Sequence, residues 1–76
     1  MLYERIRNLR EDKDMTQTEI AALLNVSQRT YSRYENDERS IPIETLSKLA
    51  DFHKTSVDYL IGRTDVKKAY PQAKNR

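Results

Sequence analysis

Four polar side chains stand at helical spacing in the middle of this 76-residue sequence: Gln28, Arg29, Ser32 and Arg33. Positions i, i+1, i+4 and i+5 lie side by side on one face of an α-helix. An arginine can donate two hydrogen bonds to O6 and N7 of guanine, and a glutamine amide can pair with N6 and N7 of adenine. We therefore expect the glutamine and the two arginines to contact DNA bases, with the shorter Ser32 as a further candidate. A solvated helix face is the alternative for the same residues.

The helix that carries these side chains needs neighbours that hold it at a fixed angle. Thr16 and Glu19 match a capping box at the start of the preceding helix, in which each side chain accepts a hydrogen bond from the other residue's backbone N–H. Asn25 tolerates the left-handed backbone of a helix end, and Ser27 can cap a new helix only two residues later. Two helices joined by so tight a turn must cross at a steep angle.

The spacing of the apolar residues predicts an all-α, compact five-helix domain. We expect helices over residues 3–13, 17–24, 28–36, from about 42 to 53 or 54, and 57–61. Apolar faces are predicted for two of them, with Ile20, Ala21, Leu23 and Leu24 on the second helix and Ile43, Leu46, Leu49 and Ala50 on the fourth. Tyr31 and Tyr34 are three residues apart and are predicted to pack inward. We expect the domain to cover residues 1–62 and residues 63–76 to form a basic, flexible tail.

Charge is divided unevenly along the chain. Residues 1–62 contain nine basic and eleven acidic residues, a net charge of −2, whereas residues 63–76 contain five basic residues and one acidic residue, a net charge of +4. The tail can bind phosphate without sequence preference or serve only as a solubilising end. The sequence contains no cysteine, has charged residues from position 4 onward and lacks a long apolar run, so we expect a cytoplasmic protein without disulfides or a membrane span.

Residues 17–36 resemble the helix-turn-helix of the lambda-type phage repressor and Cro family, also called the XRE-like family. The residues that carry the resemblance are 16–21 (TQTEIA), 24–27 (LNVS) and 32–36 (SRYEN), with 41–46 (IPIETL) and 56–62 (SVDYLIG) matching the family's fourth and fifth helices. The match extends over residues 2–65. It implies the lambda-repressor-like fold, with the second helix of the pair in the DNA major groove.

The resemblance also implies roles for single residues. Gln17, at the start of the second helix, would contact a backbone phosphate, aided by the helix dipole. Three further phosphate contacts are implied: Tyr34, Asn36 and Arg39. Arg10 and Glu35 match positions that form a structural ion pair in relatives.

A few positions depart from the family's pattern. Asn25 replaces the usual glycine, Tyr31 replaces a smaller aliphatic residue, and His53 stands where relatives carry a large apolar residue. Asp37 and Glu38 place negative charge in a loop that often faces phosphates. His53 has no companion ligand, so we expect a partly buried helix-end residue and no metal site.

These observations predict a bacterial or phage transcriptional regulator that binds a double-stranded DNA operator as a homodimer and acts as a repressor. No cofactor is expected, and no nucleophile with a base, glycine-rich phosphate loop or metal-ligand cluster suggests an enzyme. Two alternatives stay open. The chain can be an antitoxin-like partner of another protein, with DNA binding as autoregulation, or a helical module whose recognition helix binds protein.

Overall fold

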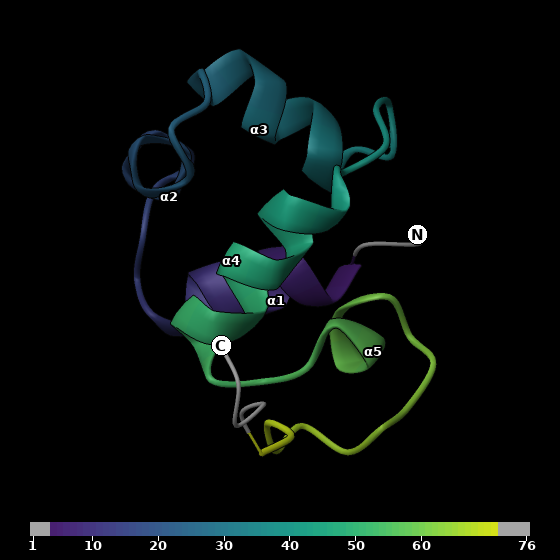
Figure 1. Ribbon diagram of the computed structural model, residues 1–76. Coiled ribbons are helices and arrows are strands. Elements are labelled where there is room, and N and C mark those ends of the chain that lie inside the picture. The colour runs from purple at the N-terminus through teal and green to yellow at the C-terminus, as the bar shows by residue number, and fades with distance from the viewer. Residues whose placement is uncertain (1–3, 72–76) are drawn as a thin grey trace.

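The computed structural model describes residues 4–71, and within them the chain forms five α-helices and no strand. The helices are α1 (Glu4–Asp12), α2 (Gln17–Leu24), α3 (Gln28–Glu35), α4 (Ile43–His53) and α5 (Val57–Leu60). In Figure 1, α3 lies along the upper edge of the molecule, whereas α5 and the segment after it lie at the opposite end. The all-α class and the order of five helices are confirmed, and α1, α3 and α5 each end one residue before the predicted boundary.

Side-chain caps fix the tight junction between α2 and α3. The Thr16 hydroxyl accepts a hydrogen bond from the Glu19 N–H at 3.1 Å, and Glu19 Oε1 accepts one from the Thr16 N–H at 2.8 Å. Asn25 ends α2 in the left-handed conformation with φ of 59°, and the Ser27 hydroxyl then accepts the Thr30 N–H at the start of α3. Asn adopts this conformation more readily than most residues, so the turn forms without glycine.

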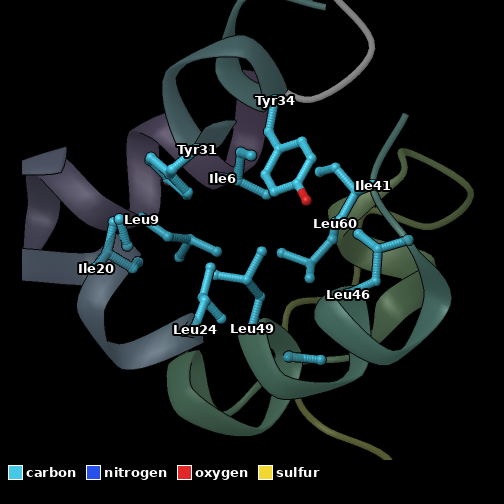
Figure 2. Packing of buried hydrophobic residues seen from close by; sticks show 12 residues of the cluster. Ile6, Leu9, Ile20, Leu24, Tyr31, Tyr34, Ile41, Leu46, Leu49 and Leu60 are labelled. Atoms are coloured by element: carbon cyan, nitrogen blue, oxygen red, sulfur yellow. The ribbon is translucent and has the colours of Figure 1, made fainter. Parts of the chain in front are cut away.

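One apolar core joins all five helices (Figure 2). Its fully buried side chains include Ile6 of α1, Ile20 of α2, Leu49 of α4 and Leu60 of α5. Tyr31 of α3 is also fully buried, and its ring meets that of Tyr34 edge to face at a centroid distance of 6.3 Å. The inward packing predicted for both tyrosines is confirmed.

Two apolar residues assigned to inward faces are instead exposed. Ile43 has 65% of its surface exposed and Leu23 has 46%. Ile43 is the first residue of α4, and the burial of that helix face begins only at Leu46. On α2 only Ile20, Ala21 and Leu24 are buried, so the buried face of this helix is narrower than the apolar face predicted from the sequence.

The segment after α5 contacts the helical body at both of its ends. Arg5 of α1 donates hydrogen bonds to the Thr64 carbonyl and to Asp65 Oδ1, and the Tyr70 hydroxyl donates one to Asp58 Oδ2 at 2.9 Å. The domain boundary at residue 62 and the flexibility of the tail stay predictions, and residues 72–76 of that tail lie outside the described part of the chain.

Candidate nucleic-acid interface

The outer face of α3 presents the side chains that the sequence analysis singled out. Gln28, Arg29 and Arg33 are exposed, and Ser32 is half-buried beside them. The opposite side of α3 is buried through Tyr31, Tyr34 and Glu35. Because the inward residues anchor the helix in the core, the polar side chains project from a rigid element.

A buried ion pair joins the end of α1 to the last turn of α3. Arg10 Nε donates to Glu35 Oε2 at 2.7 Å, and Arg10 Nη2 donates to Glu35 Oε1 at 3.1 Å. A third nitrogen, Nη1, donates to the Met15 carbonyl at 2.8 Å in the loop before α2. The ion pair implied by the family resemblance is therefore present, and it also ties down the α1–α2 loop. A backbone acceptor such as the Met15 carbonyl leaves no signal in a sequence.

The pair keeps its charges although Glu35 is only 1% exposed. Burial alone would raise the pKa of Glu35, but hydrogen bonds from Arg10 and Gln17 help to hold that pKa below its ordinary value. The hydrogen bond to Glu35 also raises the pKa of Arg10. Burial, followed by the neighbouring Glu35, raises the pKa of the Tyr31 hydroxyl. Glu35 is thus a carboxylate, Arg10 a cation and Tyr31 a neutral phenol.

Gln17 links this ion pair to the outer face of α3. Its Nε2 donates to Glu35 Oε1 at 3.1 Å, and its Oε1 accepts a hydrogen bond from Gln28 Nε2 at 2.7 Å. We call this chain of side chains the polar relay: Arg10, Glu35, Gln17 and Gln28. The sequence analysis singled out all four members and the Arg10–Glu35 pair but did not predict that Gln17 connects this pair to Gln28. The available signal was that Gln17 and Gln28 each open a helix of the tightly joined pair.

The remaining predicted contacts differ in their access to solvent. Asn36 and Arg39 are exposed after the end of α3, as phosphate contacts must be. Gln17 is half-buried, and its amide is already engaged by Glu35 and Gln28. Tyr34 is only 2% exposed, which weighs against its predicted contact with phosphate. All four assignments as phosphate contacts stay predictions.

Two other kinds of site, a metal site and a membrane-spanning helix, are absent from residues 4–71. No group of three or more histidine, aspartate or glutamate side chains there is arranged to hold a metal ion. None of the helices in that range combines the length and apolar character needed to cross a bilayer.

A polar face on the second of two tightly joined helices, carried by an all-helical body, defines a helix-turn-helix domain. The chain belongs to the helix-turn-helix family, whose model matches residues 6–60. The lambda-repressor-like fold and the XRE-type resemblance are thereby confirmed.

Several relatives are regulators of transcription. The chain is 37% identical over 67 residues to the HTH-type transcriptional regulator ImmR of Bacillus subtilis, covering 88% of this chain and 53% of the relative. It is 37% identical over 73 residues to the HTH-type transcriptional regulator AnsR of the same species, covering 96% and 63%. It is 34% identical over 65 residues to the cryptic phage CTXphi transcriptional repressor RstR of Vibrio cholerae, covering 86% and 59%.

The chain therefore spans only about half to two-thirds of the length of these relatives. The shared part contains the helix-turn-helix domain, and ImmR and AnsR are named as regulators of transcription. No solved structure matches the chain with significant similarity.

Proposed function

We propose that this protein is a sequence-specific DNA-binding regulator of transcription, and specifically a repressor, that inserts α3 into the major groove of an operator. The observation that carries the proposal is the outer face of α3, where exposed side chains with base-reading chemistry stand on a helix fixed by a buried ion pair. Its likeness to two transcriptional regulators and a phage repressor supports the same function.

Each side chain of the interface has a distinct task in this proposal. Gln28, Arg29 and Arg33 contact base edges, and Ser32 contacts a base or its sugar at shorter range. Gln17, Asn36 and Arg39 hold backbone phosphates and so set the register of the protein on DNA. The buried ring of Tyr34 supports α3 from behind, and its hydroxyl is the weakest of the proposed phosphate contacts.

The regulator acts as a homodimer in the cytoplasm, without a cofactor. A single α3, eight residues long, reads only a few base pairs. Two copies related by a two-fold axis read two half-sites about one DNA turn apart. Occupation of a promoter by the dimer excludes RNA polymerase, which gives repression.

Selection of bound sequences from a random DNA pool, with the full chain at near-physiological salt, tests this proposal. The expected result is an inverted repeat with half-sites about one turn apart, bound about 10³- to 10⁷-fold more tightly than random DNA. The affinity should also fall steeply with salt concentration, because bound phosphates release counterions.

The opposite result would be a pool without an enriched motif and binding that disappears at moderate salt. Specific readout by this chain alone would then be wrong, and the open alternative, a protein partner such as the toxin of an antitoxin pair, would take its place. Co-purification of a partner that restores motif selection would establish that alternative.

A further inference from the structure

The loop that joins α3 to α4 is fixed on the end of α3. Asp37 has a left-handed backbone with φ of 59°, and its N–H donates to the Tyr34 carbonyl at 3.3 Å. The N–H of the next residue, Glu38, donates to the Arg33 carbonyl at 2.9 Å. These two hydrogen bonds form a Schellman motif, which satisfies carbonyls in the last turn of a helix. The backbone of Glu38 therefore has a set position at the end of α3.

The side chain of Glu38 carries a negative charge that the domain does not use for its own stability. The residue is exposed, and its carboxylate makes no hydrogen bond or ion pair with any other residue of the range 4–71. The last carbonyls of a helix are themselves the negative end of the helix dipole, so a carboxylate beside them is unfavourable for folding. An explanation for this charge must therefore come from outside the folded chain.

Glu38 lies between two residues that are proposed as phosphate contacts, Asn36 and Arg39. Both are exposed in the same loop, in which consecutive Cα atoms are about 3.8 Å apart. Figure 1 shows this loop beside the end of α3, along the same upper edge of the molecule. A phosphate held by either residue would lie within roughly one Debye length of Glu38, which is about 8 Å at physiological salt. The carboxylate and the phosphate would then repel each other.

We propose that Glu38 repels the DNA backbone next to α3 and so lowers the affinity of the domain for every DNA sequence. The inference rests on the proposed function, because it assumes that α3 enters the major groove. Sequence-independent binding comes almost entirely from charge contacts with phosphates. Repulsion beside the phosphate contacts weakens this binding, so that operator affinity depends mainly on the base contacts of Gln28, Arg29 and Arg33.

The charge of the surrounding chain gives this one carboxylate weight. Residues 1–62 carry a net charge of −2, so no general positive field attracts the domain to DNA. Between residues 28 and 42 the basic side chains are three exposed arginines, Arg29, Arg33 and Arg39. One negative charge among so few positive charges is a substantial part of the local balance.

The test measures the binding of the full chain to three duplexes by fluorescence anisotropy: the operator enriched from the random pool, one half-site of that operator, and a random sequence. Glu38→Gln removes the charge and keeps the shape of the side chain. We expect it to raise the affinity for the half-site and the random duplex about threefold. The gain should be about tenfold on the operator, because two copies each lose one repulsive charge.

Salt dependence identifies the cause of the gain. The advantage of Glu38→Gln should shrink as the salt concentration rises, because dissolved ions screen the repulsion. Glu38→Lys places a cation where it can neutralise a phosphate. The slope of log affinity for the half-site against log salt concentration should therefore become steeper by about 0.9.

Asp51→Lys is the matched control, because it makes the same change in net charge as Glu38→Lys at a distant position. Asp51 is exposed near the end of α4, where it lines a groove together with Ala69 and Tyr70 of the segment after α5. That segment lies at the end of the molecule opposite α3 (Figure 1). Asp51→Lys should change each of the three affinities by less than about twofold, because salt screens distant charges.

The outcomes separate this inference from the proposed function. If an operator is enriched but both Glu38 variants bind all three duplexes like the parent, only the inference is wrong. An equal gain from Asp51→Lys would assign the effect to net charge and would also overturn it. If Glu38→Lys weakens binding to the operator but not to the half-site, Glu38 instead holds the two copies together. If no operator is enriched, the proposed function fails, and a gain on the random duplex still supports repulsion by Glu38.

Discussion

Glu35 and His53 are both buried ionisable side chains, and their surroundings are opposite. Glu35 in α3 accepts hydrogen bonds from Arg10 and Gln17 and keeps its charge. His53 at the end of α4 is 5% exposed, and neither of its ring nitrogens has a hydrogen-bond partner within residues 4–71. Its ring packs edge to face on Phe52 at a centroid distance of 5.0 Å.

The two pKa values fall for different reasons. The pKa of Glu35 is lowered because its hydrogen-bond donors outweigh the effect of burial. The pKa of His53 is lowered to about 4 because burial, assisted by the charges of Lys13 and Lys67, disfavours its protonated form. The first group is a buried charge and the second is a buried neutral ring.

Glu35 takes part in a hydrogen-bond network, whereas His53 serves only to fill the core. Near α3, the buried charge is linked through Gln17 to Gln28 on the outer face. At the end of α4, the histidine fills space in the core at the cost of leaving its ring nitrogens unsatisfied within the described chain. Buried polar groups near α3 therefore hold other side chains in place, whereas a substitution of His53 at the end of α4 can raise the free energy of unfolding.

The largest expected effect comes from breaking the ion pair. Arg10→Met leaves Glu35 as an uncompensated buried charge, so the free energy of unfolding should fall by about 3–5 kcal/mol. Chemical denaturation followed by circular dichroism would measure the change. Arg7→Met, an exposed position on the same helix, is the control and should change stability by about 0.5 kcal/mol or less. A loss below about 1 kcal/mol for Arg10→Met would contradict the structural importance of the pair.

Because His53 is buried in its neutral form, we expect the free energy of unfolding to fall at acidic pH. The unfolded chain binds a proton near the ordinary pKa of 6.5 and the folded chain only near 4, so acidification over this window favours unfolding. Stability should be greatest above pH 6.5 and should fall by up to about 3 kcal/mol as the pH decreases to 4. The effect of Glu35, whose pKa is lowered from 4.5, begins only near pH 4.5, at the acidic end of this window.

His53→Phe isolates this contribution. The variant should be more stable than the parent at pH 7 by about 1–2 kcal/mol, because no unpartnered nitrogen is buried. Its stability should change little between pH 6.5 and 5. If thermal denaturation shows the same pH dependence in both proteins, His53 is not the titrating group in this window.

The outer face of α3 and the segment after α5 should also differ in their contribution to DNA binding. Arg33→Ala, on the outer face of α3, should lower operator affinity by about 1–3 kcal/mol and relax base preference at one position. Lys67→Gln with Lys68→Gln, in the segment at the opposite end of the molecule, should lower affinity less and leave base preference unchanged (Figure 1). Fluorescence anisotropy with operator and random duplexes would distinguish them. Equal losses on both duplexes for Arg33→Ala would remove it from the base contacts.

The smallest expected effect concerns two helix ends of similar geometry. Asn25 ends α2 with φ of 59°, and Lys54 ends α4 with φ of 56°. Asparagine tolerates this conformation better than lysine, and glycine adopts it without strain. Lys54→Gly should therefore raise the free energy of unfolding by about 1 kcal/mol, and Asn25→Gly by less. A larger gain at Asn25 in denaturant titrations would reverse this ranking.

Local chemistry made much of the fold predictable. The capping box at Thr16 and Glu19, the cap at Ser27 and the apolar spacing identify the junction of α2 and α3 because they act between residues close in sequence. The periodicity of α3 also separates its exposed polar side chains from its buried tyrosines. Family resemblance added the pairing of Arg10 with Glu35, which lie 25 residues apart.

Tertiary structure decided how these parts meet. Helical period assigns a side chain to a face, but another helix determines whether that face is covered, so Leu23 and Ile43 are exposed although they match apolar patterns. The tertiary structure also places Gln17 between Glu35 and Gln28. Hydrogen bonds form over about 3 Å, and only the packed positions of α1, α2 and α3 bring these side chains within that distance.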